Sequence, residues 1–383
     1  MTPSQRQLER VRATAFELLD GVAKRAVSIC QVPAPTGAED ERAAYVASLL
    51  TGLGYTPERD DAGNVYARRG KGSGKVVLLA AHTDTVFPAG TDVSVRRDGE
   101  RLHGPGVGDN SLGVAAMLGV LELLDNLSIE TDADIVVAAT VGEEGLGNLK
   151  GVRAAVERYR PELGAVVAVE GHNLGRVTHA GVGSTRWRIR VSGPGGHSWG
   201  AFGKPNAIHG LSRIINEISR LDVPGDPKTT YNIGTIEGGT SVNTIAPGAS
   251  ALLDMRSVDA GSLKRLVDRV GSIVATAAGD GLTVDVDVLG ERPAGSCPKN
   301  DPLVVAAGDV LRQVGFEPVF DASSTDANIP ISLGIPAVCI GITHGGLGHT
   351  VNEFIDIPPI ATGLTQLGLL SIAAASIVAG GQA

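Results

Sequence analysis

The chain has 383 residues, of which 43% are apolar and only 3% aromatic, and its 33 basic and 42 acidic side chains give a net charge of -9. This length is too great for one ordinary hydrophobic core and predicts two domains. The acidic balance argues against a nucleic-acid partner, which would require a basic face. Three widely spaced cysteines exclude a disulfide framework and fit a reducing, cytoplasmic compartment.

The first elements in chain order are two amphipathic helices, predicted over residues 4–29 and 39–52 from apolar residues at helical spacing. An edge strand at 63–67 then leads to a glycine-rich turn at 70–75. This turn is not a phosphate loop, because its glycine spacing is wrong and a strand follows where a helix is required. We interpret the turn as a solvated hairpin.

Buried strands alternate with helices over the next hundred residues. The unbroken apolar runs are typical of strands covered on both faces, and they lie at 77–81, 135–141 and 165–169. Helices are predicted between and after them, at 111–125 and 152–159. The alternation predicts an α/β domain in which helices flank a mixed, mostly parallel sheet. Ligands of such sheets gather beyond the carboxyl ends of the strands.

The pattern changes near residue 182 to half-exposed strands with alternating polarity. Strand–helix–strand occurs twice, with the strands at 184–191, 230–237, 249–256 and 282–288. This order is ferredoxin-like βαββαβ. It predicts a domain inserted at 182–290 between two parts of a catalytic domain, at 1–181 and 291–383.

Neither end of the chain is predicted to enter a membrane. The N-terminal stretch carries arginines and lacks the apolar core of a signal peptide. The apolar tail at 367–378 is short for a bilayer span and contains serines, so it is predicted as a packed helix. We therefore expect no membrane partner.

His82 ends the buried strand 77–81, and Asp84 follows two residues later. Side chains at i and i+2 of extended backbone point the same way. Asp84 can therefore accept the proton of the His82 ring nitrogen that faces away from a ligand, an arrangement that orients metal-binding histidines. Taken alone, the pair is equally well explained as a strand end followed by a polar turn.

Further acidic residues and a histidine follow other strands or lie in glycine-rich loops, and the candidate metal ligands are His82, Asp109, Glu144, Glu170 and His349. With one shared carboxylate, these side chains can serve two divalent ions about 3.5–4 Å apart. Zinc is the first choice, and cobalt or manganese accepts the same ligands. Asp109 is the natural bridge, because glycines around it let its loop approach both ions; alternatively it caps the helix that follows.

Glu143 has no ligand role in this scheme. A carboxylate beside the ions can take a proton from water and pass it to a leaving amine. The simpler alternative is that the adjacent pair Glu143 and Glu144 is solvated on a surface loop.

Together these stretches resemble the metal-site motifs of the M20 metallopeptidase family, which includes acetylornithine deacetylase, succinyl-diaminopimelate desuccinylase, aminoacylase 1, glutamate carboxypeptidase and peptidase T. The motifs are His82-Thr83-Asp84-Thr85-Val86, Gly108-Asp109-Asn110, Glu143-Glu144-Gly145, Val169-Glu170-Gly171 and Gly348-His349-Thr350. The resemblance implies a dizinc site in which His82, Asp109 and Glu170 hold one ion. Asp109, Glu144 and His349 would hold the other. Glu143 would be the general base and acid, Asp84 would orient His82, and a cis peptide bond would follow Asp109.

The inserted domain resembles the lid, or dimerisation, domain of that family and implies a homodimer. His197, in Gly193-Pro194-Gly195-Gly196-His197-Ser198, would reach the partner subunit's active site and polarise the scissile carbonyl; otherwise it is an exposed loop histidine. Asn243 and Arg256 match positions that bind the substrate carboxylate, a role that suits the guanidinium. Asp326 and Asn328 resemble a pocket segment near the second metal.

The residue type at position 170 indicates the substrate class that the resemblance implies. In the family, carboxypeptidases and acyl-amino-acid deacylases have glutamate at this position, and aminopeptidases have aspartate. We therefore expect a metal-dependent hydrolase that cleaves an amide or peptide bond in a small N-acyl amino acid or short peptide with a free α-carboxylate. The alternatives are a peptidase T-like di- or tripeptide aminopeptidase and a catalytically silent metal- or peptide-binding relative. The presence of Glu143 beside the ligand set argues against the silent relative. A serine hydrolase is disfavoured, because no Gly-x-Ser-x-Gly motif occurs.

Overall fold

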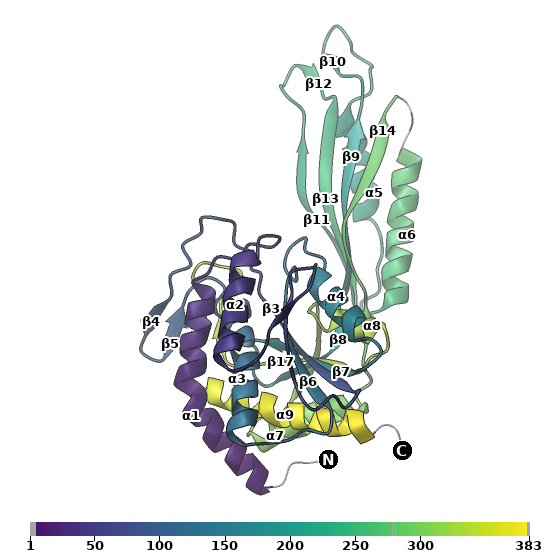
Figure 1. Ribbon diagram of the computed structural model, residues 1–383. Helices are drawn as coiled ribbons and strands as arrows, with labels where there is room; N and C mark the ends of the chain where they lie inside the picture. Colours follow the sequence, from purple (N-terminus) through teal and green to yellow (C-terminus); the bar gives the residue numbers. More distant parts are fainter. Residues whose placement is uncertain (1–4, 278, 280, 381–383) are drawn as a thin grey trace. The chain divides into compact units, whose positions relative to one another are not determined.

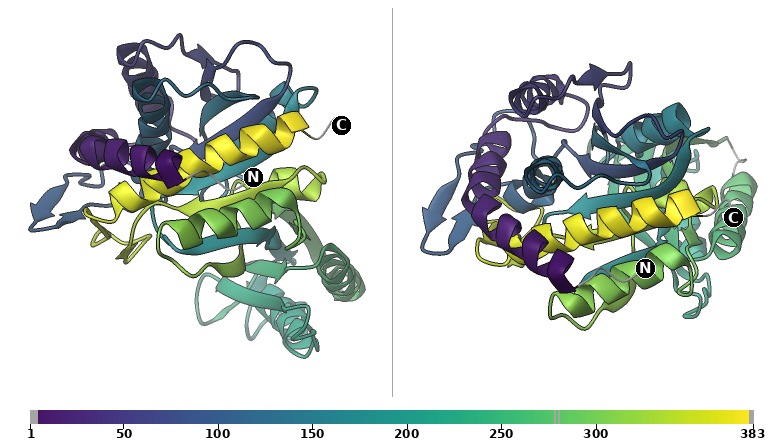
Figure 2. Two further views of the ribbon diagram at one scale, coloured as in Figure 1. Left: turned by 90° about the horizontal axis from the view of Figure 1, so that it is seen from below. Right: turned by 60° about the horizontal axis from the view of Figure 1, so that its bottom comes forward.

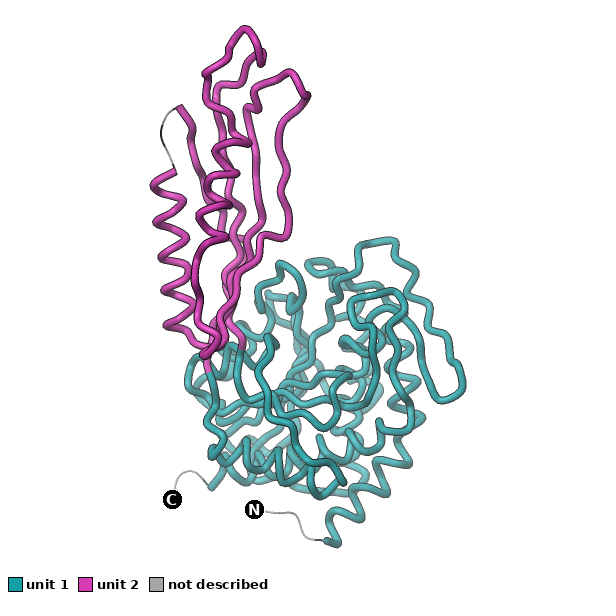
Figure 3. The backbone as a smooth tube through the Cα atoms, turned by 180° about the vertical axis from the view of Figure 1, so that it is seen from behind, with its two compact units in different colours: residues 1–181, 296–383 teal, residues 182–295 magenta. Residues whose placement is uncertain are grey.

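The computed structural model describes residues 5–277, 279 and 281–380 and divides into two compact units. Unit 1 comprises residues 1–181 and 296–383, and unit 2 comprises residues 182–295 (Figure 3). The chain leaves unit 2 later than the predicted boundary at 290, because the last strand of that unit, β14 (Thr283–Arg292), continues past it.

A mixed sheet forms the centre of unit 1, in the strand order β1-β2-β6-β3-β7-β17-β8-β15, with β16 beside β8 (Figure 1). The strands are β1 (Glu58–Arg59), β2 (Val65–Arg69), β3 (Val76–His82), β6 (Asp134–Thr140), β7 (Leu163–Glu170), β8 (Arg176–Gly181), β15 (Gly295–Ser296), β16 (Val319–Ser323) and β17 (Ala337–Gly341). The central strands β6, β3, β7 and β17 are parallel, so their carboxyl ends share one edge of the sheet. The predicted α/β fold is confirmed.

Helices cover both faces of this sheet, and they are α1 (Gln5–Cys30), α2 (Asp40–Gly52), α3 (Gly113–Asn126), α4 (Lys150–Tyr159), α7 (Pro302–Gln313), α8 (Asn328–Ser332) and α9 (Ile360–Gly380). On one face α9 lies beside α1 and α7 (Figure 2). Alternate residues of β3 enter two separate cores: Leu79 belongs to the core that contains residues of α1, α3, α7 and α9, and Leu78 belongs to the core on the α4 face. This two-sided burial explains why the strand sequence is apolar throughout.

Within the described part of the chain, two helical stretches, Val107–Asn126 and Ile360–Gly380, are long and apolar enough to cross a membrane. In the most apolar 18-residue window of each stretch, 89% and 78% of the residues, respectively, are buried inside the protein. Their apolar character is therefore accounted for by packing in the core of unit 1.

A small antiparallel sheet positions two loops of unit 1, and its strands are β4 (Arg96–Asp98), β5 (Arg101–His103), β18 (Gly345–Gly346) and β19 (Phe354–Asp356). Phe354 of β19 pairs with His103 of β5. This pairing brings the loop between β18 and β19 beside the irregular turn η1 (Val107–Leu112), which follows β5.

The predicted hairpin at 70–75 is not formed. The strands on either side of the turn, β2 and β3, do not pair, because β6 lies between them, antiparallel to β2 and parallel to β3. The turn is instead held by Asp134 of β6, whose carboxylate accepts hydrogen bonds from the backbone N–H groups of Gly72 and Ser73 at 3.0 and 3.2 Å.

Unit 2 has the predicted ferredoxin-like order, with the antiparallel sheet β11-β13-β9-β14 and helices α5 and α6. Its elements are β9 (Gly183–Ser192), β10 (Gly196–His197), α5 (Ala207–Ser219), β11 (Thr229–Gly238), β12 (Thr244–Ile245), β13 (Gly248–Ser257), α6 (Ala260–Ala277) and β14. Its core contains apolar residues of both helices and of the strands. The strands β10 and β12 form a separate two-stranded ribbon beyond Ser192, at the end of the unit remote from the entry of the chain at residue 182 (Figure 1).

Candidate metal centre

The candidate site of unit 1 lies at the edge of the sheet where the parallel strands end. His82 is the last residue of β3, Glu170 is the last residue of β7, and Glu144 follows β6. Asp109 lies in the turn η1, and His349 lies in the loop between β18 and β19. Residues far apart in the sequence therefore converge because parallel strands align their carboxyl ends.

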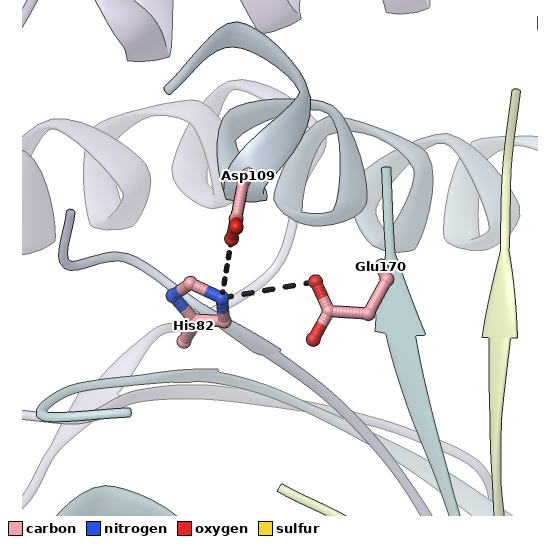
Figure 4. Close-up of side chains that lie close together, drawn as sticks. All are labelled: His82, Asp109 and Glu170. Atoms are coloured by element: carbon pink, nitrogen blue, oxygen red, sulfur yellow. Dashed lines mark ion pairs between the residues drawn. The ribbon is translucent and has the colours of Figure 1, made fainter. Parts of the chain in front are cut away.

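The first group consists of His82, Asp109 and Glu170 (Figure 4). The Nε2 atom of His82 lies 3.1 Å from Oδ1 of Asp109 and 3.7 Å from Oε2 of Glu170. In Figure 4 both carboxylates point toward the same ring nitrogen. One imidazole and two carboxylates therefore converge on a single position.

The second group shares Asp109 with the first and adds Glu144 and His349. The Nε2 atom of His349 lies 3.1 Å from Oδ2 of Asp109 and 2.9 Å from Oε1 of Glu144. The two oxygens of Asp109 are therefore divided between the two groups. This is the arrangement that a carboxylate bridging two ions requires.

The distances between each histidine and its carboxylates fit a bound divalent ion such as zinc. Ligand bonds of about 2.1 Å in a tetrahedral site place neighbouring ligand atoms about 3.4 Å apart. The contacts of His82 and His349 with the carboxylates, from 2.9 to 3.7 Å, lie on both sides of that value. The donor set of imidazole nitrogens and carboxylate oxygens is also the one that such ions prefer.

The electrostatics of the site favour cations. Burial raises the pKa of Glu170 to about 7, and the nearby charges of Asp109 and Asp326 act in the same direction. Hydrogen bonds to Asp109 and Glu144 raise the pKa of His349 to about 10. Burial acts to raise the pKa of Asp109, but the two histidines outweigh it and hold that pKa well below its usual range. Crowded carboxylates therefore create a negative potential that divalent ions would neutralise.

Asp84 acts on His82 through its backbone as well as its side chain. The Nδ1 atom of His82 lies 3.0 Å from the backbone carbonyl oxygen of Asp84, closer than the 3.5 Å to its carboxylate. An Nδ1–H that donates to this carbonyl leaves Nε2 as the ligand atom. The Asp84 carboxylate accepts the backbone N–H groups of Glu143 and Glu144 at 2.9 and 2.8 Å. Asp84 thus positions the Glu143–Glu144 turn as well as His82.

Glu143 is buried at the site, and its carboxylate oxygen lies within 4.8 Å of ligand atoms of both His82 and Glu144. The solvated-loop alternative for this pair is therefore not supported. The turn is further held by Glu39, a buried residue that sequence reasoning missed and whose carboxylate accepts the backbone N–H of Gly142 at 3.1 Å. Glu39 precedes Glu143 by more than a hundred residues, so no local pattern indicated this contact.

Asn110, rather than Asp109, caps the helix that follows. The amide oxygen of Asn110 accepts the backbone N–H groups of Gly113, which begins α3, and of Gly171, at 3.1 and 3.0 Å. The Asp109–Asn110 peptide bond is cis, as the family resemblance implied. The carboxylate of Asp109 is therefore left to the two metal groups.

Asp326 and Asn328 are both buried in unit 1. The hydroxyl of Thr140, at the end of β6, donates to Asp326 Oδ2 at 2.6 Å, and the negative charge of Asp326 contributes to the raised pKa of Glu170. Asn328 Oδ1 accepts the backbone N–H of Thr325 at 2.9 Å and stabilises the local turn. A substrate contact by either residue stays a prediction.

The remaining predicted site residues belong to unit 2. His197 and Asn243 are exposed and lie together on the β10–β12 ribbon, where His197 pairs with Thr244. The Nδ1 atom of His197 accepts the backbone N–H groups of Trp199 and Gly200, both at 3.3 Å. In the neutral imidazole the proton is then on Nε2, which makes this exposed nitrogen a hydrogen-bond donor.

Arg256 lies at the opposite end of the unit 2 sheet, where β13 pairs it with Ser184 of β9. From Ser184 to Ser192 the strand rises by about 26 Å, at about 3.3 Å per residue, and His197 follows beyond that point. Asp254 accepts a hydrogen bond from Nε of Arg256 at 2.6 Å and so orients the guanidinium. Within one copy of unit 2, His197 and Arg256 are too far apart to contact the same small molecule.

The sequence matches the profile of peptidase family M20/M25/M40 over residues 78–370. Its curated relatives include the succinyl-diaminopimelate desuccinylase of Corynebacterium glutamicum, 26% identical over 87% of this chain and 91% of that protein. Another is the LysW-lysine hydrolase of Deinococcus radiodurans, 25% identical over 87% of this chain and 91% of that protein.

Solved structures share the fold. A tripeptidase from Staphylococcus aureus superposes with a TM-score of 0.79 at 22% identity, covering 93% of this chain and 98% of that one. The YXEP protein of Bacillus subtilis, described as a dinuclear metal binding peptidase from the M20 family, gives a TM-score of 0.69 at 16% identity, with 93% and 98% coverage. At these identities the likeness concerns the fold.

Proposed function

Because this chain belongs to peptidase family M20/M25/M40, whose members are hydrolases of amide and peptide bonds, we propose that it is a dinuclear metal hydrolase of small substrates. Its substrate is an N-acyl amino acid or a short peptide with a free α-carboxylate. Zinc is the proposed metal, and cobalt or manganese can occupy the same ligands.

The observation that carries this proposal is the division of the Asp109 carboxylate between two imidazoles. Its Oδ1 and Oδ2 lie 3.1 Å from the Nε2 atoms of His82 and His349, respectively. Glu170 completes the first group, and Glu144 completes the second. Two ligand groups that share one carboxylate, each with one of its oxygens, suit two adjacent ions better than a single ion.

When bound, the ions supply Lewis acidity that polarises the scissile carbonyl and acidifies water at the site. Glu143 accepts a proton from that water and later gives it to the leaving amine. Its position is preset, because Asp84 and Glu39 hold the backbone of its turn through the N–H groups of Gly142, Glu143 and Glu144. A preset base needs little rearrangement as the reaction begins.

The names of the curated relatives support the choice of substrate. One relative is a succinyl-diaminopimelate desuccinylase, a name that describes removal of an acyl group from an amino acid, and another is a LysW-lysine hydrolase, a name that describes hydrolysis of a lysine conjugate. Arg256 binds the α-carboxylate, because an oriented guanidinium can form two parallel hydrogen bonds with it. Asn243 makes a further contact with the substrate.

The active site is shared between two copies of the chain. A dipeptide spans only about 7 Å, whereas strand β9 rises by about 26 Å from Ser184, at the level of Arg256, to Ser192, and His197 follows beyond that point. If both residues contact one substrate, they must belong to different subunits. We therefore propose a homodimer in which Nε2–H of His197 donates to the oxygen of the scissile carbonyl in the partner's site.

A comparison of Glu143→Ala and Glu144→Ala tests the metal-hydrolase proposal. The Glu143 variant should lose orders of magnitude in turnover and still bind close to two ions per chain. The Glu144 variant should lose metal as well, because one ligand of the second group is gone. Turnover should be assayed with N-acetyl and N-succinyl amino acids and with dipeptides, and metal content by mass spectrometry. Substantial turnover by the Glu143 variant, or equal metal loss by both variants, would contradict the assignment.

A further inference from the structure

A buried carboxylate lies directly behind the turn that carries Asp109. Glu353 is 0% exposed, and its Oε1 accepts the backbone N–H groups of Gly108 and Asp109 at 2.8 and 2.7 Å. Its Oε2 accepts the N–H of Gly106 at 2.7 Å. Burying a carboxylate is costly unless hydrogen bonds satisfy it, and here the backbone N–H groups of Gly106, Gly108 and Asp109 supply them.

His172 completes the environment of this carboxylate. Its Nε2 lies 2.8 Å from Oε1 of Glu353. The ring is closely enclosed by two glycines: a Cβ added to Gly108 would lie 2.2 Å from Nε2, and one added to Gly345 would lie 2.5 Å from Nδ1. The imidazole therefore has little freedom to turn, and its donor stays directed at Glu353.

The position of this pair gives it influence over both metal groups. Asp109 supplies one oxygen to each group, so a shift of its backbone displaces a ligand of both ions at once. His172 follows Glu170 by two residues, and Glu353 follows His349 by four. The pair thus links the turn that carries Asp109 to the segments that carry Glu170 and His349.

We propose that Glu353 and His172 are positioning residues for the dinuclear centre: together they hold the backbone of Asp109 so that its two oxygens face the two metal positions. This inference rests on the proposed metal dependence. Loss of the pair lowers affinity for both ions, because Asp109 belongs to both groups. Residues that orient metal ligands typically change metal affinity by about 10- to 100-fold when they are replaced.

The first variant is Glu353→Gln. Glutamine keeps the shape, but it removes the negative charge and turns an N–H₂ group toward the N–H of Gly106, so one acceptor is lost. The matched control is Asp134→Asn. Asp134 is another buried carboxylate that accepts two backbone N–H groups, from Gly72 and Ser73, and one cationic side chain. It lies at the first residue of β6, whereas Glu144 follows the last.

The second pair of variants separates the hydrogen bond from the volume of the side chain. His172→Leu removes the donor to Glu353, whereas His172→Gln offers a side-chain N–H near the place of Nε2. Zinc dissociation constants should be measured by competition with a chromogenic chelator, and the melting temperature of each metal-free protein should be recorded alongside.

We expect Glu353→Gln and His172→Leu to weaken binding of both zinc ions by about 10- to 100-fold, with a smaller loss for His172→Gln. Asp134→Asn should lower the melting temperature and leave zinc affinity unchanged. Wild-type affinity in Glu353→Gln and His172→Leu, equal loss in the two His172 variants, or equal loss in Asp134→Asn would each overturn the inference. If Glu353→Gln does not fold, the two His172 variants decide. A wild-type protein that binds neither zinc, cobalt nor manganese refutes the proposed function as well, whereas unchanged variants of a metal-binding protein refute only the positioning role.

Discussion

Mixing two inactive variants, His197→Ala and Glu143→Ala, should restore activity if each active site takes His197 from one subunit and Glu143 from the other. His197→Ala removes a donor to the oxyanion, a loss that typically costs about 10²–10³ in turnover. Glu143→Ala removes the proposed base. In a mixed dimer, one site has both residues intact and the other has neither.

The expected recovery follows from counting sites. Random exchange makes about half of the dimers mixed, and each mixed dimer has one working site of two, so about a quarter of wild-type activity should return. The structural basis is the rise of about 26 Å along β9 from Ser184, which pairs with Arg256, to Ser192, beyond which His197 lies. That span exceeds the length of a short peptide several-fold.

The assay incubates equal amounts of the two variants, one carrying an affinity tag, and follows turnover while exchange is verified by native mass spectrometry. Mixing Glu143→Ala with Arg256→Ala is the matched control. Because His197 and Arg256 of one chain are too far apart to contact one substrate, an active site that takes His197 from the partner takes Arg256 from the subunit that supplies Glu143, and we expect this mixing to restore nothing. If verified mixed dimers of the His197 and Glu143 variants stay inactive, the shared site is refuted and His197 has a local role.

Two further predictions concern the substrate and the protons of the site. Amidating the substrate's α-carboxylate should lower kcat/KM by about 10- to 150-fold, the equivalent of one charge-assisted hydrogen-bonded contact, whereas blocking the substrate's amino group should lower it much less. The effect of amidation should vanish in Arg256→Ala. A larger effect of blocking the amino group than of amidation would favour an aminopeptidase. In the metal-free protein the pKa of His349 is raised to about 10, so near pH 7.5 zinc must displace a proton. Zinc affinity should therefore rise with pH up to about 10. Titration calorimetry in two buffers of different ionisation enthalpy should detect the proton release. Zinc binding without proton release would contradict the protonated state of His349.

The strands, helices and candidate ligands of unit 1 were predictable from local patterns. An apolar run buried on both faces predicts a parallel strand, and the carboxyl ends of such strands meet at one edge. His82, Glu144 and Glu170 follow three of these runs, and the structure brings them together with Asp109 and His349. The ferredoxin-like order of unit 2 was likewise readable from alternating polarity and helical spacing.

Only the tertiary structure decided which strands pair and which groups hold the site's loops. The turn at 70–75 has the composition of a hairpin, but β6 lies between β2 and β3 in the sheet, and this pairing depends on packing between residues far apart in the sequence. The carboxylates of Glu39, Asp84 and Glu353 accept the backbone N–H groups of the turns that carry Glu143, Glu144 and Asp109. Two of these contacts, from Glu39 and Glu353, join residues that are more than a hundred positions apart. No periodicity records such contacts, because the need to satisfy a buried carboxylate arises only after the chain has folded around it.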